Sequence, residues 1–255
     1  MKSYGKLHRY RKKRYMLKNR FFWLASLALT LVTSLVSFLF FSGTFLIERV
    51  VVIGEQKVSK EAIKTLILPQ NIFLIDTQAV RMEILGSFPQ IAEVKISRGF
   101  PDSLNISVVE RVPVITWCQE DDCFLLDSKG IIFEKTAVNE AGDQRTLIRN
   151  LNDGEPNLGE RVIEEEELSK ILEIESLLKS GLKIEVKEFT TSSDDKLVVL
   201  TEDNWEIYFS LANDIDWQGT KLRAVLEEKI PQKDRRDLEY IDLRFGNFAP
   251  YKYKD

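Results

Sequence analysis

Residues 21–47 carry no charged side chain, and this run limits what the chain can fold into more than any other feature. As an α-helix the run would be about 40 Å long, enough to cross a hydrocarbon core of about 30 Å. A cleaved signal peptide has a shorter apolar region, about 7 to 15 residues, and a small-residue cleavage site. Here the run is longer and ends in the bulky residues Phe45, Leu46 and Ile47. Its length and flanking charge also argue against a buried core helix. We therefore predict a permanent transmembrane helix at 21–47.

The charge on either side of this run is strongly asymmetric. Residues 1–20 hold nine Lys or Arg residues and no acid, whereas the rest of the chain has 27 basic and 40 acidic residues. Lys and Arg beside a membrane span stay on the cytoplasmic side. We therefore expect a cytoplasmic tail at 1–20 and a body outside the cytoplasm. The tail could instead bind nucleic acid, but attraction to anionic lipid explains the same residues, so we expect no nucleic-acid partner.

The 208 residues after the span divide into two stretches of domain size. The first, 48–113, begins with a β-branched strand that stops at Gly54. Two short amphipathic helices follow, for which Ser59 and Thr77 are the expected N-caps. The order of elements predicted for this domain is strand, helix, helix, strand, strand.

The last two strands form a hairpin in "VKISRGFPDSLNISVVERVPV", residues 94–114. Apolar residues alternate with polar ones on both sides of a turn at 99–103, as half-buried strands require. Glu110 and Arg111 end the second strand. We interpret this charged pair as a solvated strand end that adds little stability.

The second stretch, 114–255, alternates strand and helix patterns. Strands are expected in "VITWC", "CFLLDSKGIIF", "KIEVKEF", "KLVVLTE", "WEIYFSLA" and "LEYIDLRF". One helix is expected at 164–180, stopped at Gly181, and another in "GTKLRAVLEEKI" before Pro231. The chain is therefore predicted to be an α+β protein with one N-terminal transmembrane helix.

No set of residues suited to catalysis stands out. The one histidine, His8, lies in the basic tail, which excludes Ser-His-Asp, Cys-His and His-rich metal sites from the body. The acid pairs Asp121-Asp122 and Asp194-Asp195 do not converge, because adjacent residues on a strand point to opposite faces. We predict no enzyme, no metal, no cofactor and no small-molecule substrate.

The two cysteines, Cys118 and Cys123, flank "QEDD". If Trp117 and Phe124 lie in paired strands, the thiols face each other at a separation that a disulfide can bridge. An oxidising compartment would permit the bond. We favour a disulfide, with two free thiols as the alternative; zinc would need two more ligands that are not evident.

Several motifs resemble a known family. The strand and helix order of 48–113 looks like a POTRA domain, a module that binds polypeptides. The segment "FPDSLNISVVERVPV" after a membrane anchor resembles the bacterial division family FtsQ/DivIB, with matching positions at Pro101, Ser103, Leu104, Glu110, Arg111 and Pro113. The helix carrying Lys-Leu and the later "YIDLRF" strand are similar to the C-terminal domain of that family.

The resemblance implies a POTRA domain at 48–113 and a C-terminal domain at 114–255 with a curved, antiparallel-rich sheet. It implies a non-enzymatic scaffold of the divisome, single-pass in the cytoplasmic membrane and placed at the division septum. The implied partners are FtsB-like and FtsL-like single-span proteins and, beyond them, the septal peptidoglycan synthesis machinery. Such a partner would add a strand to the free edge of the last sheet strand.

The partner-binding residues expected from this resemblance surround the "YIDLRF" strand: Tyr240, Leu243, Arg244, Phe245, Asn247 and Phe248. Arg244 could hold a partner carboxylate with two hydrogen bonds. Arg244→Glu is then expected to weaken binding and to leave thermal stability nearly intact. Pro250 limits any further strand to roughly three residues or to an edge position.

Two other functions remain open from the sequence. A POTRA-type chaperone of envelope assembly would have a similar first domain, although that class usually carries several such modules or a following barrel. A membrane-anchored cell-wall enzyme would need catalytic residues that converge, and the body lacks the histidines for most such sets.

Overall fold

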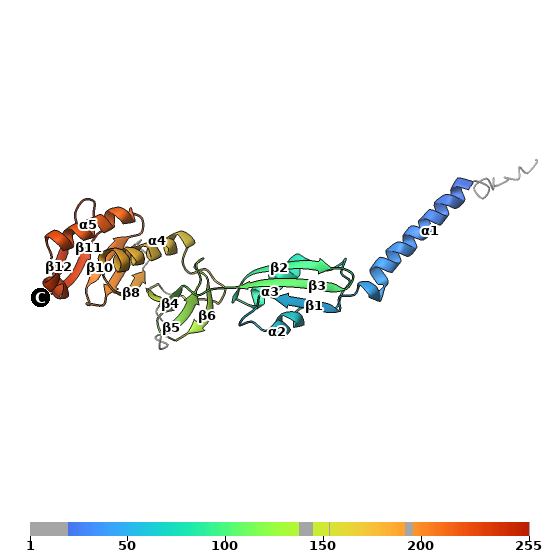
Figure 1. Cartoon of the computed structure of the whole chain (residues 1–255), viewed down its shortest axis with the longest axis horizontal. Coiled ribbons are helices and arrows are strands. Elements are labelled where there is room, and N and C mark those ends of the chain that lie inside the picture. The colour runs from blue at the N-terminus through green and yellow to red at the C-terminus, as the bar shows by residue number, and fades with distance from the viewer. Residues whose placement is uncertain (1–19, 138–144, 153, 192–195, 255) are drawn as a thin grey trace, which may run out of the picture.

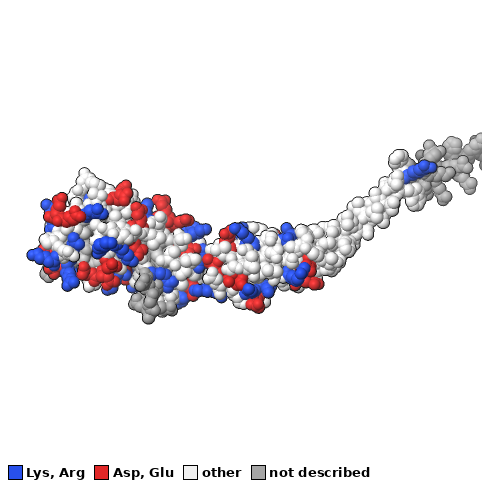
Figure 2. Space-filling model, in the orientation of Figure 1, with Lys and Arg blue, Asp and Glu red and all other residues white. Residues whose placement is uncertain are grey.

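The computed structural model describes residues 20–137, 145–152, 154–191 and 196–254. A long N-terminal helix, a small sheet domain and a larger sheet domain follow one another along an elongated molecule (Figure 1). Charged residues cover both folded domains, whereas the surface of the helix is uncharged beyond its first residue, Arg20 (Figure 2). The basic tail, apart from Arg20, lies outside the described residues, so its side of the membrane stays a prediction.

The N-terminal helix is α1 (Arg20–Phe41), 22 residues of which none is buried. By length and composition it can cross a membrane. It ends six residues before Ile47, where the sequence predicted its end, because Ser42 turns the chain into the short helix η2 (Gly43–Phe45) by accepting the Thr44 N–H. Ile47 itself is buried in the core of the next domain. Residues 42–47 therefore belong to the folded part of the chain.

The first folded domain consists of β1 (Arg49–Ile53), α2 (Lys60–Thr65), α3 (Thr77–Ser87), β2 (Ile91–Gly99) and β3 (Ser103–Glu110). This is the predicted order of elements. In the sheet β3 is central, parallel to β1 and antiparallel to β2. Apolar residues of both helices and of alternate strand positions form one buried cluster, which is the core of this domain.

The helix caps differ from the predicted ones. Thr77 is the first residue of α3, and Asp76 is its N-cap, with a carboxylate that accepts the N–H groups of Gln78 and Ala79. A carboxylate also interacts well with the positive end of the helix, which a hydroxyl does not. Ser59 does occupy the N-cap position of α2, but its hydroxyl donates to the Glu61 side chain and caps no backbone N–H.

The second domain is built on one open sheet of nine strands, in the order β12-β11-β10-β9-β8-β7-β4-β5-β6, mostly antiparallel. Its strands are β4 (Ile115–Gln119), β5 (Asp122–Leu126), β6 (Ile132–Thr136), β7 (Thr146–Asn150), β8 (Val186–Thr191), β9 (Lys196–Thr201), β10 (Glu206–Ser210), β11 (Leu238–Asp242) and β12 (Tyr251–Tyr253). The helices α4 (Glu165–Ser176) and α5 (Ile215–Glu228) pack apolar residues into the sheet core, and η4 (Gln232–Asp237) precedes β11. The fold is thus the predicted α+β arrangement of a small and a larger domain.

Strand β7 was not predicted, although it lies in the middle of the sheet. It is parallel to β4 on one side and to β8 on the other, so it joins the two halves of the sheet. Only Ile148 of its five residues is buried. A strand with one buried apolar residue has no alternation long enough to detect in the sequence.

Gly181 does not end the long helix of this domain. After α4 the chain continues through the π-helical segment η3 (Leu177–Leu182), and the left-handed residue is Lys183, with φ of 58°. The N–H groups of Lys183 and of buried Ile184 both donate to the Leu178 carbonyl, which closes the helix. The position of the turn is therefore set by the burial of Ile184 rather than by the glycine.

Arg111 joins the two domains. Its Nε donates to the Pro89 carbonyl of the first domain (2.9 Å), and its Nη1 forms an ion pair with Asp127 of the second. The two side chains are only 11% and 7% exposed. The other Asp127 oxygen accepts the N–H groups of Lys129 and Ile131 (2.9 and 3.0 Å), which shapes the turn between β5 and β6.

Glu110 holds a loop of the first domain at the same junction. Its carboxylate accepts the N–H groups of Gln56, Lys57 and Val58 at 2.7 to 3.0 Å. Partial burial opposes ionisation, but these three donors outweigh it and hold the pKa of Glu110 below its ordinary value. Lys57 in turn pairs with Glu134 of the second domain (3.1 Å). The interpretation of the charged pair at the end of β3 as a solvated strand end is therefore wrong for both of its residues.

We expect Arg111→Ala to lower the free energy of unfolding by about 3–5 kcal/mol, because it leaves a buried Asp127 carboxylate without its cation. Urea denaturation of the detergent-solubilised chain measures this. Lys57→Ala is the matched control, since it removes an exposed ion pair at the same junction and should cost about 0–1 kcal/mol. Equal losses for the two variants would contradict the assignment.

Candidate partner-binding site

The sheet of the second domain ends at β12, a strand of three exposed residues. It pairs antiparallel with β11, with Leu238 opposite Tyr253 and Ile241 opposite Tyr251. Pro250 lies immediately before it, so the strand has the short length and edge position expected from that proline. Within the described part of the chain, the two edge strands of this sheet are β12 and β6, so the "YIDLRF" strand β11 is not an edge strand.

Helix α5 holds the loop between β11 and β12 in place. Lys221 Nζ donates to the carbonyls of Leu243 and Phe245 at 2.5 and 2.6 Å. Trp217 Nε1 donates to the Gly246 carbonyl at 3.2 Å. Burial lowers the pKa of Lys221, and the nearby Asp242 carboxylate acts in the opposite direction. These bonds give the loop a defined path across the end of the sheet.

Arg244 is already occupied by a carboxylate of this chain. Its Nε and Nη2 donate to the two oxygens of Asp242 at 2.9 and 2.6 Å, and its own N–H donates to the same carboxylate. Burial opposes ionisation of Asp242, yet these bonds outweigh it and lower the Asp242 pKa. Asp242 is 7% exposed and Arg244 35%, so the guanidinium forms the surface of a half-buried pair.

Aromatic side chains surround this pair. The guanidinium lies 5.7 Å from the Tyr208 ring centroid, and Tyr208 stacks on Tyr240 with centroids 5.2 Å apart. Burial, with a hydrogen bond to Glu206, raises the pKa of Tyr208, so its hydroxyl stays protonated. Beside them, Phe245 and Phe248 stack with nearly parallel rings, 5.7 Å apart.

The six residues expected to bind a partner differ in their exposure to solvent. Phe245, Asn247 and Phe248 are exposed on the β11–β12 loop, and Tyr240 and Arg244 are half-buried beside them. Leu243 is fully buried in the domain core, so its side chain offers no surface to a partner. Strand alternation gave the sign of this in the sequence, because Leu243 lies two residues after the buried Ile241 and on the same face.

The sequence patterns did not identify other residues of this surface. Trp217 is 48% exposed and lines an apolar groove of about 470 Å³ together with Val225, Phe248, Ala249 and Tyr251. Tryptophan on the outer turn of an amphipathic helix is the signal that could have found it, since exposed aromatic residues are enriched at interfaces. The groove runs between α5 and the segment leading into β12.

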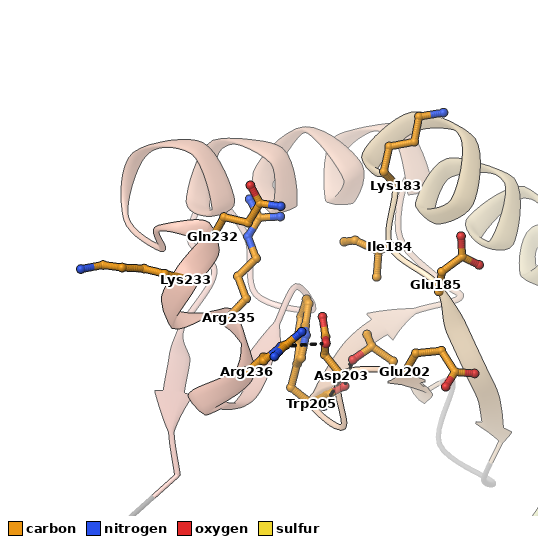
Figure 3. A pocket seen from close by; sticks show the side chains of 11 residues that line it. Lys183, Ile184, Glu185, Glu202, Asp203, Trp205, Gln232, Lys233, Arg235 and Arg236 are labelled. Atoms are coloured by element: carbon orange, nitrogen blue, oxygen red, sulfur yellow. Dashed lines mark hydrogen bonds and ion pairs between the residues drawn. The ribbon is translucent and has the colours of Figure 1, made fainter.

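A larger hollow of about 740 Å³ lies elsewhere on the domain, beside η4. Its walls carry Arg235, Arg236 and Lys233 opposite Glu185, Glu202 and Asp203, and Arg236 is directed at Asp203, 3.5 Å away (Figure 3). This mixed lining contains no nucleophile with an adjacent base. Among the described residues no group of three or more His, Cys, Asp or Glu could hold a metal ion.

The acidic pairs considered above have ordinary surroundings where they are described. Asp122 pairs with Lys135 across the β5–β6 hairpin (2.7 Å). Asp194 and Asp195 lie outside the described residues. Cys118 and Cys123 face each other across β4 and β5, with Cα atoms 4.1 Å apart and their sulfur atoms bonded. Both are buried, so the bond reinforces the hairpin from inside.

An N-terminal helix long and apolar enough to cross a membrane, a small sheet domain and a second, larger sheet domain define the class: a POTRA-type protein with one candidate membrane span. Residues 45–111 match the FtsQ-type POTRA domain family, and residues 115–244, more than half of the chain, match the family described as cell division protein FtsQ/DivIB, C-terminal. The chain belongs to the FtsQ/DivIB family of bacterial cell division proteins. This is a family of division scaffolds rather than of enzymes.

Individual relatives agree with this family. The chain is similar to cell division protein FtsQ of Chloroflexus aurantiacus, 25% identical over 85% of this chain and 77% of the relative. It is 26% identical to FtsQ of Neisseria meningitidis serogroup B over 72% of this chain and 70% of the relative. With FtsQ of Syntrophotalea carbinolica the identity is 36%, over 42% of this chain and 37% of the relative.

The Asp242–Arg244 pair predicts a pH dependence. A carboxyl group whose pKa is lower in the folded state stabilises the fold above its unfolded pKa, about 3.9, and this stabilisation is lost as the pH falls through the folded pKa. Asp242→Asn should therefore be less stable than the wild type at neutral pH, and the difference should shrink in acid. Urea denaturation between neutral and acidic pH measures both.

Glu239→Gln is the control for this experiment. Glu239 pairs with Lys252 at 2.5 Å, but both side chains are more than 40% exposed. Its removal should change the stability by less than about 1 kcal/mol at every pH. A constant difference between Asp242→Asn and the wild type across the whole range would show that the pair does not titrate as described.

Proposed function

We propose that this protein is a bitopic scaffold of the divisome that recruits other division proteins by strand addition at β12. The observation that carries the proposal is the position of β12 as the short outer strand of the sheet, beside the exposed stacked pair of Phe245 and Phe248. A partner strand laid along β12 would gain backbone hydrogen bonds there. Its side chains would meet the aromatic loop and the groove at Trp217.

The proposed partners are FtsB-like and FtsL-like single-span proteins, and through them the septal peptidoglycan synthesis machinery. We expect the partner segment to carry an acidic residue that binds Arg244. A guanidinium has five N–H groups, and the bonds to Asp242 leave some of them for a second carboxylate. The aromatic residues around it supply the rigid apolar contacts typical of binding hot spots. Arg244 and Phe248 therefore serve different parts of one contact.

Arg244→Glu is a poor test of this contact. The sequence alone led us to expect nearly intact stability for that variant. In the structure the substitution would place a second carboxylate against the half-buried Asp242 and remove its cation. Such a change destabilises the fold as well as any contact, so the expectation is withdrawn.

Phe248→Asp tests the partner site without that difficulty. Phe248 is 64% exposed, so the variant should fold with unchanged stability and lose most of its pull-down of the FtsB-like partner. Leu151→Asp is the matched control, because Leu151 is 63% exposed and follows β7, away from β12. Loss of binding in neither variant, or in both, would remove the assignment of the site.

The topology forms part of the proposal: tail 1–20 in the cytoplasm, α1 across the cytoplasmic membrane, and both domains outside the cytoplasm at the septum. The lack of charge in residues 21–41 of α1 and the nine basic residues before residue 21 support it. Alkaline phosphatase fused after Asp255 should be active, since the enzyme matures only outside the cytoplasm. A green fluorescent protein fused at the same place should then stay dark after export, and the reverse result would overturn the topology.

Family membership favours this role over the two alternatives left open by the sequence. A chaperone of envelope assembly and a wall enzyme are both classes outside the FtsQ/DivIB family. The mixed-charge hollow beside η4 also supports no particular reaction, because its lining mixes acids with arginine and lysine residues and Asp203 is paired with Arg236.

A further inference from the structure

Three uncharged segments meet at the end of the POTRA domain nearest to α1. The first is 21–47, which contains the helix; the second is 65–75, between α2 and α3; the third is 99–101, the tip of the β2–β3 hairpin. In Figure 2 the uncharged surface of the helix continues across the join onto this end of the domain. These segments are far apart in sequence, and the fold brings them together.

Aromatic side chains connect the helix to this end of the domain. Phe45 contacts Phe38 of the last turns of α1 and Phe73, with ring centroids 5.7 and 5.2 Å apart. Phe73 also contacts Phe40 at 6.2 Å and Phe100 at 5.3 Å. One continuous cluster thus runs from the membrane-length helix to the hairpin tip.

The outer members of this cluster expose apolar surface. Phe100 is 61% exposed, Leu74 is 62% exposed and Phe73 is 39% exposed. We call these three residues the apolar tip. Val112 is also exposed, but it follows the end of β3 that lies opposite the hairpin tip. Only continuity distinguishes the tip from ordinary scattered surface residues.

The backbone beneath the tip is hydrogen-bonded within the protein. Asn71 Nδ2 donates to the carbonyls of Leu39 and Phe40 at 2.9 and 3.2 Å, and so caps the C-terminal end of α1. The Asn71 side-chain oxygen accepts the Phe73 N–H at 2.9 Å. Arg98 covers the far side of this loop, where its guanidinium donates to the carbonyls of Ile72 and Ile75 at 2.8 and 2.7 Å.

These internal hydrogen bonds suit a loop that moves from water into the membrane interface. A backbone group without a partner is costly in a low-polarity environment, whereas one bonded inside the protein is not. The loop therefore presents apolar side chains outward while the polar groups named above bond inward. In water this arrangement would leave large apolar groups exposed for no structural gain.

The depth of the tip follows from the length of α1. Its 22 residues span about 33 Å, close to the hydrocarbon thickness of about 30 Å. The last turn, with Phe38 and Phe40, then lies at the membrane surface, and the rings in contact with it lie at the same level. The charges nearest to the tip are the Arg98 guanidinium, which is bonded to the loop itself, and the ion pair of Arg49 and Asp102 (2.6 Å). All three groups would stand among the headgroups.

We propose that the apolar tip inserts into the interfacial layer of the bilayer that α1 crosses, so that the POTRA domain rests on the lipid. The proposal depends on the anchoring by α1 proposed above. With two attachments, one through α1 and one through the tip, the domain cannot swing freely about residues 42–47. The second domain is then carried at a set height and direction from the membrane.

Nitroxide labels on introduced cysteines test this in the full chain reconstituted into phosphatidylglycerol–phosphatidylethanolamine nanodiscs with one copy each. Leu74→Cys and Phe100→Cys report the tip, Val112→Cys is the exposed control, and Leu31→Cys reports the middle of α1. The ratio of collisions with oxygen to collisions with a water-soluble nickel chelate should be several-fold higher at both tip positions than at Val112, and highest at Leu31. Unlabelled wild type serves as the blank, since its cysteines are bonded to each other.

The possible outcomes separate the tip from the anchor. If Leu31 is protected while both tip labels collide with nickel as often as the Val112 label, the tip proposal fails alone. If the Leu31 label is also exposed to nickel, the anchoring fails and the tip proposal with it. Protection of the tip only when discs hold two copies would assign this surface to contact between copies and overturn insertion into lipid.

Discussion

The buried ion pair between Arg111 and Asp127 is the interaction on which the arrangement of the whole molecule depends. Two domains joined by a short connection move relative to each other by default, unless something specific holds them. Here the pair is supported on both sides, by the Pro89 carbonyl in one domain and by a turn of backbone N–H groups in the other. Those extra bonds compensate for removing two charges from water. The join therefore transmits the orientation of the first domain to the second.

The same principle operates at the far end of the molecule. Asp242 holds Arg244, and Lys221 holds the carbonyls of the loop that follows, so the charged groups of this region are satisfied within the chain. A surface whose groups are already positioned loses little conformational freedom when a partner binds. The exposed Phe245 and Phe248 then project from a loop that cannot easily rearrange. The preorganised loop beside β12 and the rigid junction at Arg111 and Asp127 both support the proposed binding of a partner.

Sequence patterns predicted the elements that are long and strongly periodic. The membrane-length helix, the β2–β3 hairpin and the helix before Pro231 all carry apolar residues at the spacing of their structure, and each is present. Short or weakly periodic elements were not predicted, above all β7, whose place in the sheet depends on the neighbouring strands on both sides. The exact residues at which helices begin and end were not predicted either. Asp76 replaces Thr77 as a cap, since either side chain can accept a backbone N–H at that position. Lys183 takes the left-handed conformation in place of Gly181, against the intrinsic preference for glycine, because buried Ile184 fixes where the helix closes.

By itself the sequence determined the class of the protein: an uncharged span after a basic tail, then two domains with family motifs and no histidine outside that tail. Only the tertiary structure decided what the charged motif residues do. Glu110, Arg111 and Arg244 all looked available to solvent or to a partner, yet each is bound to groups of its own chain. Hydrophobic periodicity is a local property that the sequence displays directly. The partner of a charge is a long-range property, and it exists only once the chain has folded.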